Sequence, residues 1–180
     1  MHNERLAVDH VGLTVPDLDQ AVTFFTEAFG CEEIFRAGPY SDCGYFWPGE
    51  AKPEVATVRL AMLRHCGTHN VELLEYKDRS RVDRPEAPRP TERGGAHLAF
   101  YVDDIHALVD ALRKRNDVRF LGVVEREQGG PIDGLEWVYL LTPWGLVIEL
   151  LRWEPGQLPY EAGTSARLIP PPWLRDTATG

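Results

Sequence analysis

The chain contains an internal repeat, and this repeat restricts the fold more than any other feature of the sequence. The segment HVGLTVPDLDQAV, which begins at His10, matches HLAFYVDDIHALV, which begins at His97, 87 residues later. Each copy ends in a related apolar stretch, NVELLEY at 70–76 and VIELLRW at 147–153. A chain that matches itself at such a spacing is built from two copies of one structural unit.

Within each copy, the spacing of apolar residues predicts a strand, a helix and three further strands. Asp17 is suited to cap the first helix at its N-terminus and Gly30 to end it, and Asp103 or Asp104 is suited to cap the second. The apolar stripes of these helices are Leu18, Ala21, Val22, Phe25 and Phe29 in the first copy, and Ile105, Leu108, Val109 and Leu112 in the second. Alternating patterns then predict strands at 57–64 and 70–76, around the turn HCGTH, and at 135–141 and 146–153, around TPWG.

The predicted fold class is α+β, with two tandem βαβββ modules that form a curved, cleft-lining mixed sheet. The first module spans 6–78 and the second spans 94–153, with a proline-rich linker at 79–93 and an irregular tail at 154–180. In the first strand, Val11, Leu13 and Val15 are expected to share the face that meets the helix.

Composition excludes several classes of function. The net charge of −9 and the pI near 5.1 oppose binding to nucleic acid, which requires clustered basic residues. No stretch approaches the roughly 20 apolar residues that span a bilayer, and residues 1–10 do not resemble a signal peptide. We therefore expect a cytoplasmic protein whose three cysteines, Cys31, Cys43 and Cys66, are reduced thiols.

Four polar residues recur at equivalent positions of the repeat: His10 with His97, and Glu72 with Glu149. Carboxylates between apolar neighbours are costly to bury without a partner, and a divalent cation would offset that cost. Two imidazoles and two carboxylates suit Zn²⁺, Ni²⁺, Co²⁺, Mn²⁺ or Fe²⁺, and the absence of a thiolate argues against a closed structural zinc site. We predict that these four residues hold one metal ion.

Residues of these types also have interpretations that involve no metal. A single glutamate in an apolar strand can instead pair with an arginine such as Arg64 or Arg152. His65 and His69 would bind metal only if their turn were helical, and a hairpin loop is favoured there. His106 is expected at the surface of the second helix, His2 in a frayed terminus, and Cys66 as an unreactive loop thiol.

The chain resembles the vicinal oxygen chelate superfamily, which includes glyoxalases, bleomycin-resistance proteins and extradiol dioxygenases. DHVGLTVPDLDQAVTFFTEAFG and GGAHLAFYVDDIHALVDAL resemble the two opening segments of that superfamily, and NVELLEY and LTPWGLVIELLRW resemble its glutamate strands. Two departures are the turn Thr142-Pro143-Trp144-Gly145, where the family often has an Asp, and the longer insertion and tail.

The resemblance implies a ligand set and a reaction class. His10, Glu72, His97 and Glu149 match the four metal ligands of glyoxalase I, whereas methylmalonyl-CoA epimerases, otherwise similar, usually have Gln at the place of Glu72. The expected function is therefore that of a lyase or isomerase acting on a small carbonyl or carboxyl compound through a metal-stabilised enediolate. Glu149, or alternatively Glu72, would move the proton.

Two alternatives remain open at this point. One is a non-haem Fe²⁺ dioxygenase that uses His10, His97 and Glu149 as its triad, and the other is a metal-free antibiotic-binding protein. A homodimer is expected, with the cleft formed within one chain or by exchange between two. The aromatic residues of the insertion are candidates for a wall or lid over that cleft: Tyr40, Tyr45, Phe46 and Trp47.

Overall fold

The computed structural model describes residues 8–41, 55–65, 69–77, 88–89, 91–154 and 159. The chain divides into two compact units, unit 1 at Met1–Arg84 and unit 2 at Pro85–Gly180, and each has its own sheet. The predicted linker and tail lie largely outside the described residues, as do Tyr45, Phe46, Trp47, Cys43 and Cys66.

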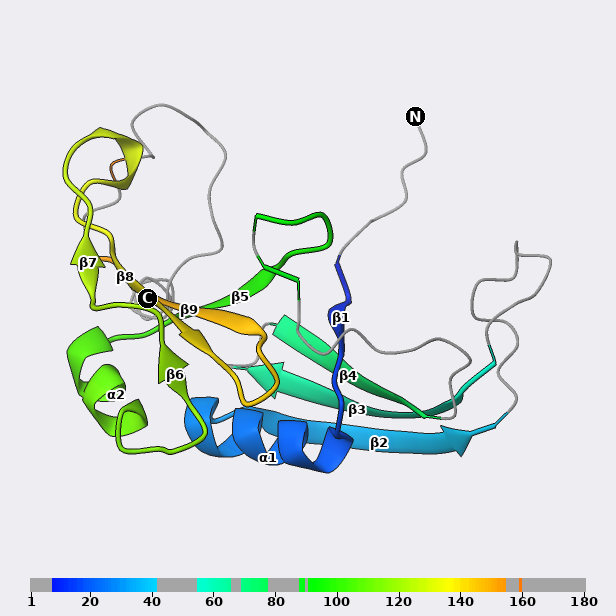
Figure 1. The fold of residues 1–180 in the computed structure, drawn as a ribbon. Coiled ribbons are helices and arrows are strands. Elements are labelled where there is room, and N and C mark those ends of the chain that lie inside the picture. Colours follow the sequence, from blue (N-terminus) through cyan, green and yellow to red (C-terminus); the bar gives the residue numbers. More distant parts are fainter. Residues whose placement is uncertain are drawn as a thin grey trace, which may run out of the picture. The chain divides into compact units, whose positions relative to one another are not determined.

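Unit 1 is a complete βαβββ module (Figure 1). Its elements are β1 (His10–Thr14), α1 (Leu18–Phe29), β2 (Glu32–Tyr40), β3 (Thr57–His65) and β4 (His69–Lys77). The strands lie in the order β1-β4-β3-β2, with β1 parallel to β4 and the other neighbours antiparallel. The sheet is therefore mixed, as the sequence predicted.

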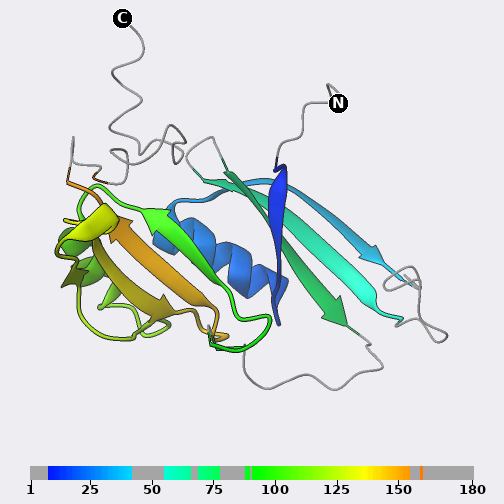
Figure 2. The same ribbon diagram turned by 90° about the horizontal axis from the view of Figure 1, so that it is seen from above.

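Helix α1 begins and ends where its caps require. The side chain of Asp17 accepts a hydrogen bond from the backbone N–H of Gln20, and Gly30 adopts the left-handed conformation with φ of 65°. The apolar stripe of α1 is buried against β3 and β4 on one face of the sheet (Figure 2). Both predicted caps and the predicted stripe are confirmed.

Strand β1 differs in part from its predicted pattern. Val15, just beyond the strand, is 2% exposed and Leu13 is partly buried, but Val11 is 49% exposed. Val11 and Leu13 alternate in register as residues of one strand face do, but that face is not covered at Val11. Val11 lies near the start of β1, at the end of the strand far from the turn into α1.

Unit 2 repeats the module with a reduced second strand. Its elements are β5 (His97–Tyr101), α2 (Ile105–Leu112), β6 (Arg119–Phe120), β7 (Glu125–Arg126), a 3-10 turn (Gly130–Ile132), β8 (Glu136–Leu141) and β9 (Val147–Arg152). The strands lie in the order β5-β9-β8-β6, with β5 parallel to β9 and with β7 also pairing with β8. Gly122, Gly129, Gly130 and Gly134 have positive φ angles in this region, which explains why no long strand forms there.

Helix α2 resolves the choice between two predicted caps. Asp104 is the N-cap, and its side chain accepts a hydrogen bond from the backbone N–H of Ala107. Ile105, Val109 and Leu112 are buried as predicted, and Leu108 is partly buried. Neither α1 nor α2, the two α-helices in the described ranges, is long and apolar enough to cross a membrane.

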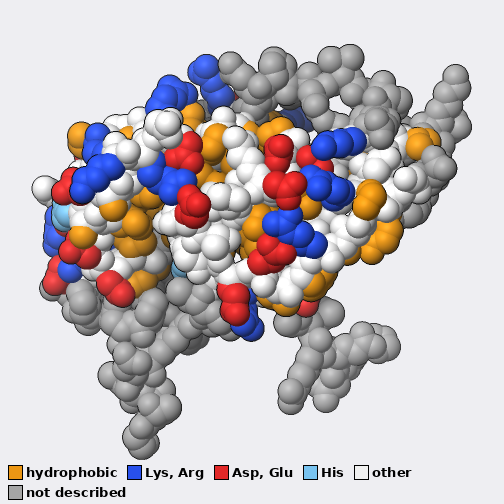
Figure 3. Space-filling view, turned by 90° about the horizontal axis from the view of Figure 1, so that it is seen from below, with side chains coloured by type: hydrophobic (Ala, Val, Ile, Leu, Met, Phe, Trp, Pro, Cys, Tyr) orange, Lys and Arg blue, Asp and Glu red, His pale blue; other side chains and the backbone are white. Residues whose placement is uncertain are grey.

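Unit 1 contains one buried carboxylate that the sequence did not predict. Glu75 on β4 is 1% exposed and lies 2.7 Å from Arg59 and 3.2 Å from Lys77. It also accepts a hydrogen bond from the backbone N–H of Leu18, so it ties β4 to the start of α1. Arg59 and Arg36 both bind Asp19 at the surface. Acidic and basic side chains lie beside one another in small groups on the face shown in Figure 3.

Candidate metal and active site

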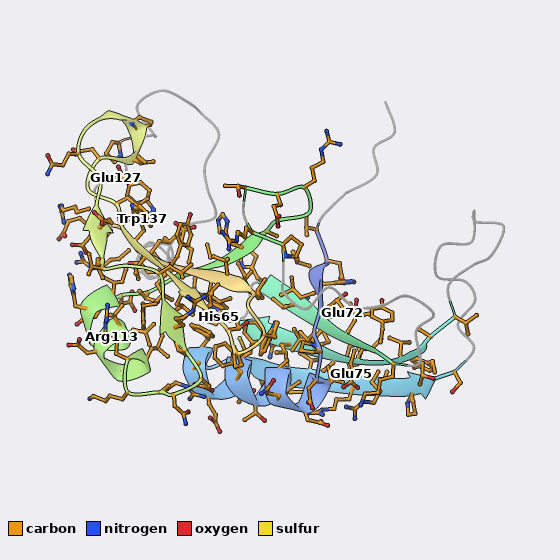
Figure 4. The ribbon with its side chains drawn as sticks, viewed as in Figure 1. His65, Glu72, Glu75, Arg113, Glu127 and Trp137 are labelled. Atoms are coloured by element: carbon orange, nitrogen blue, oxygen red, sulfur yellow. The ribbon has the colours of Figure 1, made fainter. Side chains whose placement is uncertain are left out.

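Unit 1 brings His10 and Glu72 together through the pairing of β1 with β4. His10 stands opposite Asn70 in the parallel register, and Gly12 stands opposite Glu72, so the histidine and the glutamate occupy the same face. His10 Nε2 lies 3.4 Å from Glu72 Oε2, and both side chains are partly exposed. Figure 4 shows Glu72 on β4. A Cβ at Gly12 would lie at an ordinary contact distance of 3.6 Å from Glu72 Oε2 and at a tighter 3.3 Å from Leu74, so glycine avoids crowding against Leu74 beside this carboxylate.

Asp9 orients the imidazole of His10. Asp9 Oδ1 lies 2.7 Å from His10 Nδ1. This hydrogen bond, supported by the charge of Glu72 and opposed by partial burial, raises the pKa of His10 above its ordinary value. When His10 is neutral, a proton on Nδ1 leaves the Nε2 lone pair on the side of Glu72. At metal sites, the histidine nitrogen that does not bind the metal commonly forms such a hydrogen bond to a carboxylate.

Unit 2 forms the same pair through the same register. His97 stands opposite Val147, and Glu149 follows two residues later, beside Ala99. His97 Nε2 lies 3.0 Å from Glu149 Oε2. Burial raises the pKa of the Glu149 carboxyl above its ordinary value, and the neighbouring His97 offsets part of that effect. The repeat seen in the sequence is thus a repeat of side-chain geometry.

Two aromatic residues of β8 surround the pair in unit 2. Tyr139 stands opposite Glu149, and its ring centroid lies 5.7 Å from that of His97. Trp137 follows on the same face, with its ring centroid 5.1 Å from that of Tyr139. Burial and the charge of Glu149 raise the pKa of Tyr139. No sequence pattern predicted either residue. The aromatics predicted near the site were those of the insertion, of which Tyr40 is 48% exposed at the end of β2.

The arginines and the other histidines have partners or positions outside the two pairs. Arg64 pairs with Glu32, and Arg152 with Glu136 and Glu154, so neither arginine neutralises Glu72 or Glu149. His65 and His69 stand opposite each other at the ends of β3 and β4, which confirms the hairpin. Burial, with a contribution from His69, lowers the pKa of His65. His106 is exposed on α2, as predicted.

The donors of each pair suit a borderline divalent ion, but one pair alone is too small a site. Each unit supplies one imidazole nitrogen and one carboxylate oxygen, at equivalent positions of its own sheet. Such ions take four or more ligands from these donor types. Within the part of the chain that the structure describes, no group of three or more His, Cys, Asp or Glu side chains is placed to hold a metal. The described residues of each unit thus supply two candidate ligands for such an ion.

Comparison with known proteins supports an isomerase. The chain is 43% identical over 169 residues to 2-epi-5-epi-valiolone epimerase from Actinomyces sp, and the match covers 92% of this chain and 89% of that protein. Epimerases are isomerases, so the expected class of lyase or isomerase is confirmed on the isomerase side.

Solved structures agree in fold. A glyoxalase family protein from Bacillus cereus matches with a TM-score of 0.64 and 22% identity over 84% of this chain and 97% of that one. A glyoxylase/bleomycin resistance protein/dioxygenase domain from Frankia sp. EAN1pec matches with a TM-score of 0.59 and 19% identity over 84% of this chain and 100% of that one. The family model for the same group matches residues 7–150. The chain belongs to the Glyoxalase/Bleomycin resistance protein/Dioxygenase superfamily.

Proposed function

We propose that this protein is a divalent-metal-dependent epimerase of a small, hydroxylated, sugar-like ketone. The observation that carries the proposal is the pair of equivalent His–Glu contacts, His10 with Glu72 and His97 with Glu149. The similarity to 2-epi-5-epi-valiolone epimerase, which extends over most of both chains, supports the choice of substrate class. The protein would act in the cytoplasm as a homodimer, without nucleic acid or membrane partners.

The ion would be one of Zn²⁺, Ni²⁺, Co²⁺, Mn²⁺ and Fe²⁺, and its ligands would be His10, Glu72, His97 and Glu149. The two pairs would meet within one chain or between two chains of the dimer. When bound, the metal would supply Lewis acidity at the carbonyl oxygen of the substrate. Asp9 would keep the Nε2 of His10 available as a donor.

The two glutamates would carry the proton. Inversion at a carbon next to a carbonyl requires that one C–H bond breaks on one face of the substrate and another forms on the opposite face. Glu149, as a carboxylate, would accept the departing proton, while the electron pair of the C–H bond moves toward the carbonyl oxygen. Glu72, once it has left the ion and taken up a proton, would deliver that proton from the other side as those electrons return to carbon. Equivalent positions in a duplicated scaffold suit such paired roles.

The two alternatives are less well supported. An Fe²⁺ dioxygenase would use His10, His97 and Glu149 as ligands and Glu72 only as a supporting group around them, whereas Glu72 faces its histidine as Glu149 does. A metal-free antibiotic-binding protein would not require either pair. The epimerase relative favours neither of them.

The direct test is proton exchange with 2-epi-5-epi-valiolone in D₂O, followed by NMR after loading the protein with each of the five metals. We expect epimerisation with deuterium incorporated at the inverted carbon. Glu149→Gln should lower kcat by at least about 10²-fold, the usual scale for loss of a general base. Glu32→Gln is the matched control, because Glu32 is an exposed partner of Arg64. A folded wild-type protein that exchanges no proton with any of these metals would contradict the proposal.

A further inference from the structure

Strand β8 of unit 2 presents an aromatic pair, Trp137 and Tyr139, on the face that carries Glu149. Trp137 and Tyr139 are partly buried, while Val138 and Leu140 between and beyond them are 2% and 0% exposed on the opposite face. Tyr139 stands opposite Glu149, and Trp137 stands opposite Leu151. The aromatic pair is therefore next to the His97–Glu149 contact, not in the core beneath the sheet.

The rings form a continuous surface that starts at the imidazole. The ring of Tyr139 meets that of His97 at an interplanar angle of 64°, and Trp137 meets Tyr139 at 59°. These are tilted and edge contacts, which leave ring area available to a third partner. A ligand beside Glu149 would thus lie beside aromatic side chains.

Trp137 is fixed in place by Glu127. The indole N–H donates a hydrogen bond of 2.7 Å to Glu127 Oε1, and the two residues lie together beside β7 and β8 (Figure 4). The backbone of Glu127 is itself bonded to Leu135 and Gly134 on the adjoining turn. The large ring is therefore held in one orientation before any ligand arrives, which reduces the entropy lost on binding.

The first unit lacks this feature at the equivalent positions. Met62 stands opposite Glu72 where Tyr139 stands opposite Glu149, and Leu60 takes the place of Trp137. The module thus folds with aliphatic side chains there, so the fold alone does not require aromatic residues. The two units share the His–Glu contacts but differ in the residues beside those contacts.

We propose that Trp137 and Tyr139 form a stacking wall that selects a hydroxylated six-membered ring as the substrate. Such a ring has apolar C–H faces and a polar rim, and rigid aromatic side chains offer it a large contact area at low entropic cost. The wall would favour a cyclic ketone over a short acyclic one that reacts at the same two glutamates. This inference rests on the proposed function.

The test transplants the side chains of unit 1 into unit 2. Tyr139→Met and Trp137→Leu should each raise KM and Kd for 2-epi-5-epi-valiolone about tenfold, the scale of an aromatic contact residue, with a much smaller change in kcat. Metal content should stay as in the wild type. Glu127→Ala should also raise KM, and Glu127→Gln, which can still accept from the indole, should restore it.

The outcomes separate the two proposals. A wild-type protein that binds the cyclic ketone in calorimetry but does not epimerise it would contradict the proposed function and leave the wall supported. Unchanged KM and Kd in both Tyr139→Met and Trp137→Leu would overturn the wall alone. A wild-type protein that binds no cyclic ketone would overturn both.

Discussion

At the scale of single residues, the contact between Asp9 and His10 distinguishes the two halves of the candidate site. The imidazole of His10 is hydrogen-bonded to the carboxylate of the preceding residue, Asp9, whereas the residue before His97 is Ala96, which has no carboxylate. The positions of the four candidate ligands follow from the repeat in the sequence. Asp9 and Tyr139 do not, because neither recurs in the other copy and a contact between side chains has no periodic signature.

Removal of the Asp9 carboxylate should weaken metal binding without unfolding unit 1. Asp9→Ala places an alanine before His10, as Ala96 stands before His97 in unit 2. Loss of a carboxylate that orients a ligand histidine typically reduces metal affinity about 10- to 100-fold. Competition with a coloured chelator measures the affinity. Asp110→Ala, at an exposed position of α2, is the control and should bind metal as the wild type does. Equal affinities in all three proteins would exclude the orienting role of Asp9.

At the scale of elements, the alternation of strands and the helix caps could be predicted, and the irregular parts could not. The Asp17 cap and the hairpin between β3 and β4 follow from local patterns that the structure confirms. The two short strands β6 and β7 replace one regular strand, because several glycines interrupt the pairing. Glu75 was also missed, since its partner Arg59 lies on a different strand.

The stability of unit 1 should depend on the ionised form of Glu75. Burial alone would raise the pKa of Glu75, but hydrogen bonds from Arg59, Lys77 and Leu18 outweigh it and lower the pKa below the ordinary value of 4.5. A lowered pKa in the folded state means that the stabilisation is present above pH 4.5 and is lost as the pH falls toward the folded value.

Glu75→Gln should therefore be less stable at neutral pH by roughly 2 kcal/mol, the scale of a lost charged hydrogen bond to a buried group. The difference from the wild type should shrink as the pH falls below about 4.5, because the unfolded wild-type chain takes up a proton on Glu75 there while the folded chain does so only at lower pH. Urea titrations at several pH values measure both quantities. A difference that does not change with pH would show that the charge of Glu75 is not the stabilising feature.

At the scale of the whole molecule, duplication explains why two modules place a histidine and a glutamate in the same register. Local patterns in the sequence specify each module, and the structure confirms both mixed sheets. The meeting of the two pairs depends on how one module packs against another, in one chain or between two. Hydrophobic periodicity does not encode that packing, so the sequence predicts the four candidate ligands but not how the two modules bring them together.

The most direct measurement is the metal content of the protein, purified without a histidine tag and analysed alongside His10→Ala and His97→Ala. A shared site predicts a single divalent ion per chain in the wild type and almost complete loss in either variant, although each variant alters only one module. Content that is unchanged in both variants, or halved in each, would contradict a site built from both pairs.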